Sequence, residues 1–308
     1  MNIKILQGNC IETLQKLDDK SINTCITSPP YWGLRNYNDE EKQLGMEDTP
    51  EEFVDNLVKV FREVKRVLRD DGTVWLNLGD SYSSGGRTTT TNQSLRGNKD
   101  YGVTRPKPSK GIKPKDLIGI PWRVALALQQ DGWYLRQDII WHKPNPMPES
   151  VKDRCTKAHE YIFLLSKNVK YYFDNEAIKE DAKFPEGPNS AHKIRKGCDD
   201  PKMKTRTGLH KIGANPKRNK RSVWTITTKP FKGAHFATFP KDLIEPCVLA
   251  GCPEGGTVLD PFGGSGTTGI VAVNNNRHAV LCELNQEYIN LAKDRINQEG
   301  GMFVDITE

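Results

Sequence analysis

The chain has 308 residues, of which 36% are hydrophobic, enough for one large α/β domain with an insertion or for two modest domains. Its formal net charge of +6 is concentrated in residues 183–221, which hold twelve Lys or Arg and three Asp or Glu, as in a polyanion-binding surface. Seven cysteines without a C-x-x-C pair argue against a disulfide framework or a zinc site, and the lack of a signal-peptide pattern or a long apolar run predicts a soluble, cytoplasmic protein.

The first half of the chain alternates short apolar strands with amphipathic helices. Thr49, Pro50 and Glu52 form a capping pattern at the start of a long helix, and residues 70–72 (Asp-Asp-Gly) are expected to stop it. The expected strands are residues 3–6, 22–27, 73–80, 134–141 and 160–166, and the expected helices are residues 11–17, 50–69 and 122–130. Residues 81–114 are polar and basic, and they predict a mobile loop.

Periodicity is lost and then regained in the second half. Residues 175–225 show no clear helix or strand pattern, so we expect a small separate module or insertion there. The expected helices that follow are residues 241–250, 266–274 and 286–297, and the expected strands are residues 257–260 and 278–283. This alternation predicts an α/β fold with a mostly parallel sheet.

The segment TVLDPFGGSGTTG at residues 257–269 has the pattern G-x-G-x-x-G between a strand and a helix. The pattern is typical of nucleotide-type ligands, and Glu283, at the end of the next strand, is placed to meet a ribose diol. No lysine follows the glycines, which argues against a Walker A phosphate loop but leaves a dinucleotide open. Asp260 could hold an ammonium group and Phe262 could face a base or a sulfonium, a combination that suits S-adenosylmethionine.

A second unusual stretch, Ser28-Pro29-Pro30-Tyr31, follows the strand at residues 22–27. The two prolines remove two backbone donors and fix φ at both positions, so the strand should end in a rigid, exposed hook. The carbonyl groups of this hook have no helix or sheet partner. We therefore expect them to accept hydrogen bonds from another molecule.

Together, TSPPYW at residues 27–32 and DPFGGSGTT at residues 260–268 resemble the permuted (beta) group of S-adenosylmethionine-dependent DNA amino methyltransferases, in which the catalytic motif precedes the cofactor motif. The resemblance covers most of the chain, because four further blocks occur in the family's order. These blocks are WLNLGDSY at 75–82, EYIFLLSK at 160–167, HFATFPKDLIE at 235–245 and CELN at 282–285.

The resemblance implies a Rossmann-like methyltransferase fold, S-adenosylmethionine as the cofactor and double-stranded DNA as the substrate. The target base is then flipped out of the duplex, and the Ser28 side chain and the Pro29 carbonyl accept the two N–H groups of its exocyclic amine. Pro30 helps to keep these acceptors rigid, and Tyr31 stacks on the base. The implied cofactor-binding residues are Asp260, Phe262, Gly264, Gly266, Thr267 and Glu283, with Thr238 and Phe239 beside the methionine part.

The residue before the prolines bears on which base is methylated. Serine there is typical of cytosine-N4 enzymes in the family and Asp or Asn of adenine-N6 enzymes, so Ser28 favours cytosine N4, with adenine N6 as the alternative. A cytosine-C5 enzyme would need a thiolate, and Cys247 after Pro246 falls inside an apolar helical segment that predicts a buried packing cysteine. More remote alternatives are a nicotinamide-dependent oxidoreductase and an inactive DNA-binding protein.

The resemblance also divides the chain into three parts. Residues 1–174 would form the catalytic half of the methyltransferase domain, residues 175–225 an inserted target-recognition region, and residues 226–308 the cofactor-binding half. Basic residues of the insertion are expected to contact DNA phosphates, among them Lys217, Arg218, Lys220 and Arg221. We expect no metal, and a restriction-modification or phage context with a cognate restriction endonuclease as a candidate partner in the cytoplasm of a bacterial or phage-infected cell.

Overall fold

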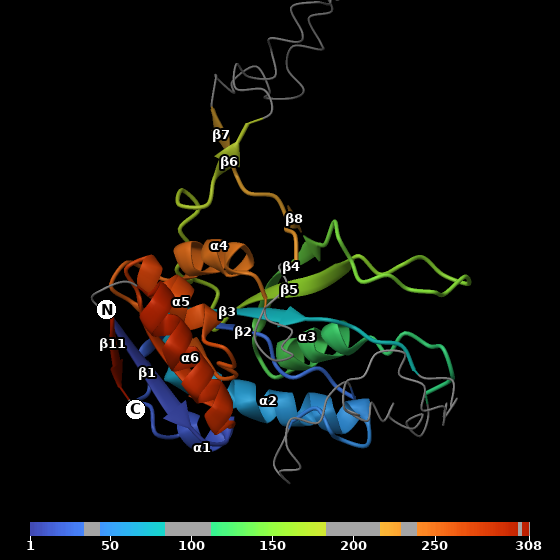
Figure 1. Ribbon diagram of the computed structural model, residues 1–308, viewed down its shortest axis with the longest axis horizontal. Helices are drawn as coiled ribbons and strands as arrows, with labels where there is room; N and C mark the ends of the chain where they lie inside the picture. The colour runs from blue at the N-terminus through green and yellow to red at the C-terminus, as the bar shows by residue number, and fades with distance from the viewer. Residues whose placement is uncertain (34–43, 84–111, 183–215, 229–238, 301–303, 308) are drawn as a thin grey trace, which may run out of the picture. The chain divides into compact units, whose positions relative to one another are not determined.

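A nine-stranded sheet forms the centre of the larger of two compact units (Figure 1). The computed structural model describes residues 1–33, 44–83, 112–182, 216–228, 239–300 and 304–307. The larger unit comprises Met1–Phe173 and Ser222–Glu308, and the smaller unit is Asp174–Arg221. In spatial order, the strands of the sheet are β11 (Asp305–Thr307), β1 (Asn2–Gln7), β10 (His278–Glu283), β9 (Thr257–Asp260), β2 (Ile22–Thr27), β3 (Leu68–Leu78), β5 (His159–Ser166), β4 (Tyr134–His142) and β8 (Val223–Thr225).

The sheet is mostly parallel. Its only antiparallel pairs among the described strands are those that β5 makes with β3 and β4. β2 and β9 are direct neighbours, paired at Cys25 and Leu259, although they come from opposite ends of the chain. Both strands are apolar and buried over most of their length, as expected when helices cover both faces of a parallel sheet. The predicted α/β fold is confirmed.

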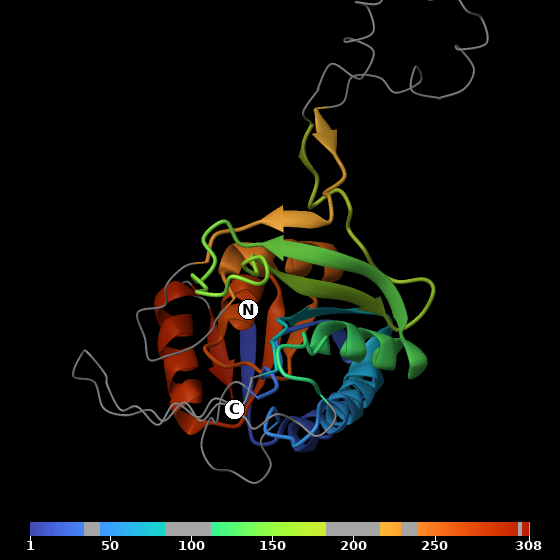
Figure 2. The same cartoon turned by 90° about the vertical axis from the view of Figure 1, so that its right-hand side faces the viewer.

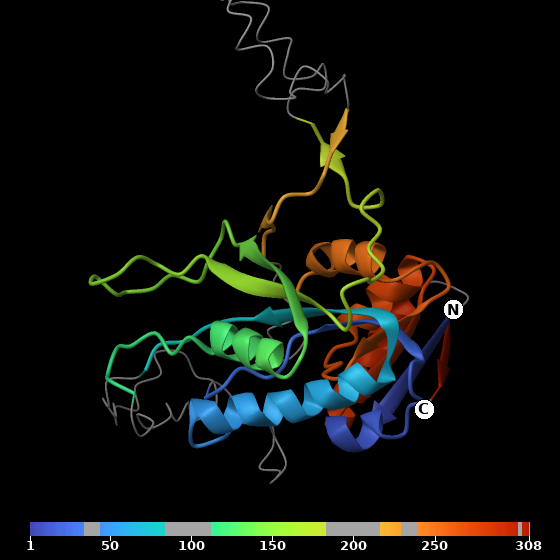
Figure 3. The same cartoon turned by 180° about the vertical axis from the view of Figure 1, so that it is seen from behind.

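Helices pack on both faces of this sheet (Figure 2). Helices α1 (Cys10–Leu14), α2 (Pro50–Val67) and α3 (Ile120–Gln130) cover one face, which is turned to the viewer in Figure 3. Helices α4 (Lys241–Gly251), α5 (Thr267–Asn274) and α6 (Gln286–Glu299) cover the other. The larger unit therefore has three layers. Helices cover both faces of its sheet, so a site is expected among the loops at the carboxyl ends of the strands.

The start of α2 follows from its sequence. The Thr49 hydroxyl accepts a hydrogen bond from the backbone N–H of Glu52, and the Glu52 carboxylate accepts one from the backbone N–H of Thr49. This reciprocal capping box satisfies two N–H groups that the first turn would otherwise leave without a partner. The apolar face of the helix is buried in the core over five turns.

The predicted end of α2 is wrong. The helix ends at Val67 and β3 begins at once with Leu68, so residues 70–72 lie within a strand. Leu68 has an extended backbone, is fully buried and pairs with Ile22 of β2. Burial of this apolar side chain in the sheet thus outweighs the local turn tendency of Asp-Asp-Gly.

The smaller unit contains a short antiparallel ladder of β6 (Glu180–Asp181) and β7 (Lys217–Arg218). Residues 222–225, which we assigned to the insertion, instead lead into β8 and pair with β4, so the larger unit resumes at Ser222. Most of the basic segment, residues 183–215, lies outside the described residues. The same holds for residues 84–111 of the predicted mobile loop.

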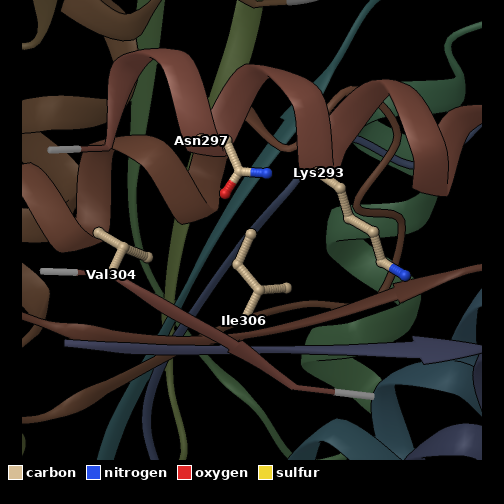
Figure 4. Close-up of a pocket in the computed structure, with 4 residues that line it drawn as sticks. All are labelled: Lys293, Asn297, Val304 and Ile306. Carbon is tan, nitrogen blue, oxygen red and sulfur yellow. The ribbon is translucent and has the colours of Figure 1, made fainter. Parts of the chain in front are cut away.

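A shallow hollow lies at one edge of the sheet, between α6 and β11 (Figure 4). Its lining is mixed, with Lys293 and Asn297 from the helix and Val304 and Ile306 from the strand side. Strands β1 and β10 separate β11 from β9, so this hollow is distinct from the edge where β2 and β9 end. Within the described ranges, no helix has the length and apolar composition needed to cross a membrane.

Gly251, the last residue of α4, is expected to be needed for close packing of that helix on the sheet. A Cβ at this position would lie 2.6 Å from Nε1 of Trp75 and 2.9 Å from Oγ1 of Thr24. Gly251→Ala should therefore lower the free energy of unfolding by about 1–3 kcal/mol, measured by denaturant unfolding. Glu245→Ala, at an exposed position of the same helix, is the matched control. A Gly251→Ala protein as stable as this control would show that the contact is not tight.

Candidate active site

The residues predicted to form the site meet where β2 and β9 end. Because these strands are parallel neighbours, their carboxyl ends lie side by side at one edge of the sheet. The hydroxyl of Thr27, the last residue of β2, donates a 2.6 Å hydrogen bond to Oδ1 of Asp260, the last residue of β9. The proline hook and the glycine turn follow these two residues, so they are fixed to each other at their starting points.

Asp260 is almost fully buried and serves as the anchor of the glycine turn. Besides the Thr27 hydroxyl, it accepts hydrogen bonds from the Thr268 hydroxyl (2.6 Å, to Oδ2) and from the Phe262 N–H (3.1 Å, to Oδ1). Burial raises the pKa of Asp260, and the three hydrogen bonds oppose that rise. The direct contact with a ligand ammonium group that we predicted for Asp260 stays a prediction.

Two glycines of the turn have conformations and surroundings that suit a ligand loop. Gly264 (φ +48°) and Gly266 (φ +77°) lie in the left-handed region that favours glycine. A Cβ on Gly264 would meet only the Phe262 carbonyl oxygen, at 3.8 Å, so a ligand can approach the backbone here. A Cβ on Gly266 would lie 3.0 Å from Cβ of Ala292, so this glycine allows α6 to pack closely on the turn.

Glu283, at the end of β10, joins the glycine turn to the turn that precedes α6. Its Oε2 accepts a hydrogen bond from the Gly264 N–H (2.8 Å), and its Oε1 accepts one from the Asn285 N–H (2.9 Å). Burial raises the pKa of Glu283, and the backbone hydrogen bonds act against that shift. Each carboxylate oxygen keeps a further lone pair, so the predicted contact with a ribose diol is compatible with this geometry.

Arg295 of α6 is a residue of the site that sequence reasoning missed. Its Nη1 donates to the Ser265 carbonyl (2.6 Å) and lies 2.7 Å from the Ser265 hydroxyl and 3.2 Å from Oγ1 of Thr267. Thr267, a predicted cofactor residue, is buried and belongs to this network. An arginine on an amphipathic helix gives no sequence signal for such a role, because most arginines in that position are solvated.

The proline hook is anchored by the residue that follows it. Trp32 is 6% exposed, lies in the hydrophobic core and donates an indole hydrogen bond to the Glu47 carbonyl (2.9 Å). Pro29 is buried, whereas Ser28 and Pro30 are partly exposed. None of the described residues donates a backbone hydrogen bond to the Pro29 carbonyl. The hook therefore offers rigid acceptors next to the glycine turn.

A cluster around Glu160, which we call the Glu160 brace, holds Tyr31 of the hook. The Tyr31 hydroxyl donates a 2.7 Å hydrogen bond to Oε2 of Glu160, and the Asn77 amide reaches the same oxygen at 3.3 Å. The Lys143 ammonium group forms an ion pair with Oε1. Sequence analysis recognised the blocks that contain Asn77 and Glu160 but could not predict this contact, because β3, β4 and β5 meet only in the folded sheet.

On the side of β3, the backbone of Gly79 packs directly against Tyr31. The pKa of Tyr31 is raised well above its usual value, first by burial and then by the charge of Glu160, while the Ser28 side chain and the Gly79 N–H act in the opposite direction. A Cβ on Gly79 would lie 2.6 Å from Cε2 of Tyr31, so the tyrosine ring rests directly on the glycine backbone. The Tyr31 hydroxyl is thus within reach of both the Ser28 side chain and the Gly79 N–H.

Not all predicted residues come together in the described structure. Phe239 is partly buried just before α4, and Thr238 lies outside the described residues. The four predicted DNA-binding residues, Lys217, Arg218, Lys220 and Arg221, belong to the smaller unit. Within that unit, Lys217 pairs with Asp181, and both Arg218 and Arg221 pair with Glu180. Their contact with DNA stays a prediction.

Cys247 does not form a nucleophilic site. It is 1% exposed on α4, and its thiol contacts the carbonyl of Leu243 one turn earlier. The predicted role as a packing cysteine is confirmed, and an exposed thiolate of the kind that cytosine-C5 chemistry needs is not formed at this position.

The chain matches a protein-family model described as DNA methylase, of the N6/N4 group, over residues 22–294. It is 51% identical to the Type II methyltransferase M.SmaI of Serratia marcescens, over 95% of this chain and 90% of that protein. It is 47% identical to the Type II methyltransferase M.Cfr9I of Citrobacter freundii, over 96% and 88% of the two chains.

Solved structures share the fold. A DNA methyltransferase described as PvuII, cytosine-N4-specific, superposes with a TM-score of 0.63 at 19% identity, over 99% of this chain and 95% of that one. A putative DNA modification methylase from Thermus thermophilus, solved in complex with S-adenosyl-L-methionine, gives a TM-score of 0.61 at 23% identity and covers both chains completely. With the glycine turn and the proline hook side by side at the sheet edge, the chain belongs to the N6/N4 family of S-adenosylmethionine-dependent DNA methyltransferases.

Proposed function

We propose that this protein methylates the exocyclic N4 of cytosine at a specific site in double-stranded DNA, with S-adenosylmethionine as the methyl donor. The observation that carries the proposal is the hydrogen bond between Thr27 and Asp260, which ties the proline hook to the glycine turn. A methyl donor on the turn and an amino group on the hook would then be held next to each other. The enzyme would act in the cytoplasm of a bacterial or phage-infected cell.

The hook activates the amino group by accepting its hydrogen bonds. An amino nitrogen conjugated to a base is planar and a poor nucleophile. When the Ser28 side chain and the Pro29 carbonyl accept its two N–H groups, the lone pair turns out of the plane of the ring. Pro30 keeps the acceptors rigid, and Tyr31, held at its hydroxyl by Glu160, offers a ring on which the flipped base stacks.

The residues of the glycine turn fit S-adenosylmethionine. The backbone at Gly264 is open to a ligand, the Glu283 carboxylate lies beside it to accept the ribose hydroxyls, and Phe262 is partly buried near the strand end. When bound, the cofactor supplies an electrophilic methyl group. Gly266 and Thr267 support the turn against α6, and Asp260 fixes its start. Phe239, just before α4, and Thr238 are the further cofactor-binding residues of this proposal.

Serine at position 28 supports cytosine N4 over adenine N6. In the family that the sequence resembles, serine before the proline pair is typical of cytosine-N4 enzymes, and the PvuII enzyme of the same fold is described as cytosine-N4-specific. The alternative is adenine-N6 methylation, which would use the same fold, cofactor and hook. The smaller unit, Asp174–Arg221, would read the target sequence, with Lys217, Arg218, Lys220 and Arg221 near the DNA backbone. A cognate endonuclease is the expected partner of such an enzyme.

The first prediction concerns the product. Incubation with S-adenosylmethionine and unmethylated genomic DNA, followed by nucleoside digestion and mass spectrometry, should give N4-methylcytosine. Ser28→Ala should lower kcat by about 10²- to 10³-fold, because one acceptor of the amino group is lost. Ser21→Ala, an exposed serine just before β2, is the matched control. N6-methyladenine as the product would overturn the choice of base.

The second prediction separates two roles of Asp260: anchoring the glycine turn by hydrogen bonds, and direct contact with the ammonium group of the cofactor. Asp260→Ala removes the acceptor of three buried donors and should shift the glycine turn, so the dissociation constant of S-adenosylmethionine should rise at least roughly tenfold. Asp260→Asn keeps an acceptor oxygen and nearly the same shape but removes the charge. Because we predict that this charge also holds the ammonium group of the cofactor, Asp260→Asn should bind nearly as weakly as Asp260→Ala, measured by calorimetry. Binding within about threefold of the wild type would leave Asp260 only the role of anchoring the turn.

Asp294→Asn, at an exposed position of α6, controls for the loss of one negative charge. If Asp260→Asn binds the cofactor as weakly as Asp260→Ala does, the carboxylate contacts the ammonium group of the cofactor directly. If Asp260→Ala binds like the wild type, Asp260 has no part in the cofactor site.

The third prediction is a pH dependence of cofactor binding. The pKa of Glu283 is raised from 4.5, so Glu283 takes up a proton at a higher pH than an ordinary glutamate does. The ribose hydroxyls are best accepted by the carboxylate, so the dissociation constant should rise as the pH falls through that raised pKa. Glu283→Gln should bind weakly at every pH in calorimetry between about pH 5 and about pH 8.

The same shift has an opposite consequence for stability. Because the folded protein holds the proton of Glu283 more tightly than the unfolded chain does, the contribution of Glu283 to stability falls as the pH rises from 4.5 through the folded pKa. Glu287→Gln, on the exposed first turn of α6, should bind the cofactor with the pH dependence of the wild type. A Glu283→Gln protein that also keeps that dependence would exclude Glu283 as its source.

A further inference from the structure

The loop between β4 and β5, residues 143–158, emerges at the edge of the sheet that carries the site. β4 runs in the same direction as β3 and β2, because β5 is antiparallel to both β3 and β4. The β4–β5 loop therefore starts at the same edge as the proline hook, and it extends beyond the sheet in Figures 1 and 3. Its first residue, Lys143, pairs with Glu160, which in turn binds Tyr31.

The base of the β4–β5 loop is fixed to its surroundings on two sides. The Lys143 N–H donates to the Ala158 carbonyl (2.8 Å) and closes the loop. On one side, the Asn145 side chain exchanges two hydrogen bonds with the backbone of Thr228, at 3.1 and 3.0 Å. On the other, the Lys157 ammonium group donates to the Asp80 carbonyl (3.0 Å). The base of the loop is thus fixed at the sheet edge, and the Lys143–Glu160 ion pair links it to Tyr31 of the hook.

The outer part of the loop is braced as well. Arg154 forms an ion pair with Glu149 (2.7 Å) and lies over the ring of Tyr82, 3.7 Å from its centroid. The Asp153 carboxylate pairs with Lys115 (2.7 Å). Lys115 and Asp153 are largely exposed, so their ion pair adds little stability, whereas Arg154 and Glu149 are only partly exposed.

An apolar side chain projects from this braced loop. Met147 stands between Pro146 and Pro148, which fix the backbone on both sides of it. Its exposure, 85%, is the highest among the large apolar side chains of the described residues. Single exposed apolar residues are common on protein surfaces, but this one stands between two prolines in a loop that begins at the sheet edge where the proline hook lies. The loop also carries four basic and two acidic residues, a balance that suits a DNA partner.

We propose that Met147 is a wedge that enters the base stack of the DNA beside the target pair and holds open the space that the flipped base leaves. Apolar side chains such as Met act in this way when a protein inserts them between base steps. The flanking prolines restrict the backbone at Met147, which lowers the entropy that this segment loses on binding. This proposal rests on the proposed DNA methylation but does not depend on whether cytosine or adenine is the target.

The test compares Met147→Ala and Met147→Leu with the wild type on two duplexes. Both carry the methylation site mapped from the genomic DNA product; in one the target base is paired, and in the other it faces a mismatched base. Met147→Ala should lower kcat/KM on the paired duplex by roughly 10- to 100-fold and stay within about threefold of the wild type on the mismatched duplex, where unstacking is easier. Met147→Leu, which restores apolar bulk, should remain close to the wild type on both.

Val169→Ala is the matched control, because Val169 is 67% exposed but follows β5 at the opposite edge of the sheet. A second readout is the fluorescence of 2-aminopurine at the target position with S-adenosylhomocysteine present, which reports flipping without methyl transfer. Met147→Ala should lower this signal and Val169→Ala should not.

Two results would overturn the wedge. The first is a Met147→Ala enzyme that equals the wild type on the paired duplex, and the second is an equal loss on both duplexes, which would assign Met147 to general DNA binding. Neither result bears on the product of the wild-type enzyme. Conversely, N6-methyladenine as the product would overturn the proposed cytosine specificity and leave the comparison of the two duplexes intact.

Discussion

The arrangement of the site depends on one hydrogen bond, from the Thr27 hydroxyl to the Asp260 carboxylate. It joins the last residues of two parallel strands that lie next to each other in the sheet although they are far apart in the chain. Because both groups are buried, no water competes for the bond, and a bond to a charged group of this kind contributes about 1.5–3 kcal/mol. The proline hook and the glycine turn therefore start from two residues that are fixed to each other.

The Glu160 brace provides the second constraint on the same hook. Thr27 fixes where the hook starts, Trp32 anchors its end in the core, and Glu160 holds Tyr31 between them. The brace takes residues from β3, β5 and the end of β4, the part of the sheet that contains its antiparallel strand. A hook held at three points is preorganised, which is the condition that the proposed catalysis by hydrogen-bond acceptors requires.

How far the sequence predicts this structure depends on how local each signal is. The capping box of Thr49 and Glu52 and the strand limits at residues 22–27 and 257–260 agree with the structure, because caps and uninterrupted apolar runs act over a few residues. The end of α2 was mispredicted because pairing of Leu68 with Ile22 is a tertiary contact. Edge strands β8 and β11, of three residues each, are too short to carry a pattern.

The difference between local signals and tertiary contacts also explains which parts of the site could be predicted. The proline hook and the glycine turn each have a local motif, and each directly follows a predicted strand. The roles of Lys143, Glu160 and Arg295 have no local signal, because each acts through an atom of a residue that is distant in the sequence. Asp260 has a motif but its hydrogen-bond partners could not be read from it, since Thr27 comes from the other half of the chain.

The Glu160 brace also gives a physical reason why position 28 is neutral in this chain. The Ser28 side chain interacts with the Tyr31 hydroxyl, which donates a hydrogen bond to the Glu160 carboxylate. A second carboxylate, that of Asp260, accepts a hydrogen bond from Thr27, the residue before Ser28. A carboxylate at position 28 would lie near two others, of which Glu160 is already paired with Lys143, and like charges raise one another's pKa values and disfavour ionisation. Serine accepts a hydrogen bond there without that penalty. If Ser28 is the acceptor of the amino group, as proposed, the choice of residue at this position is therefore coupled to the residues that hold the hook in place.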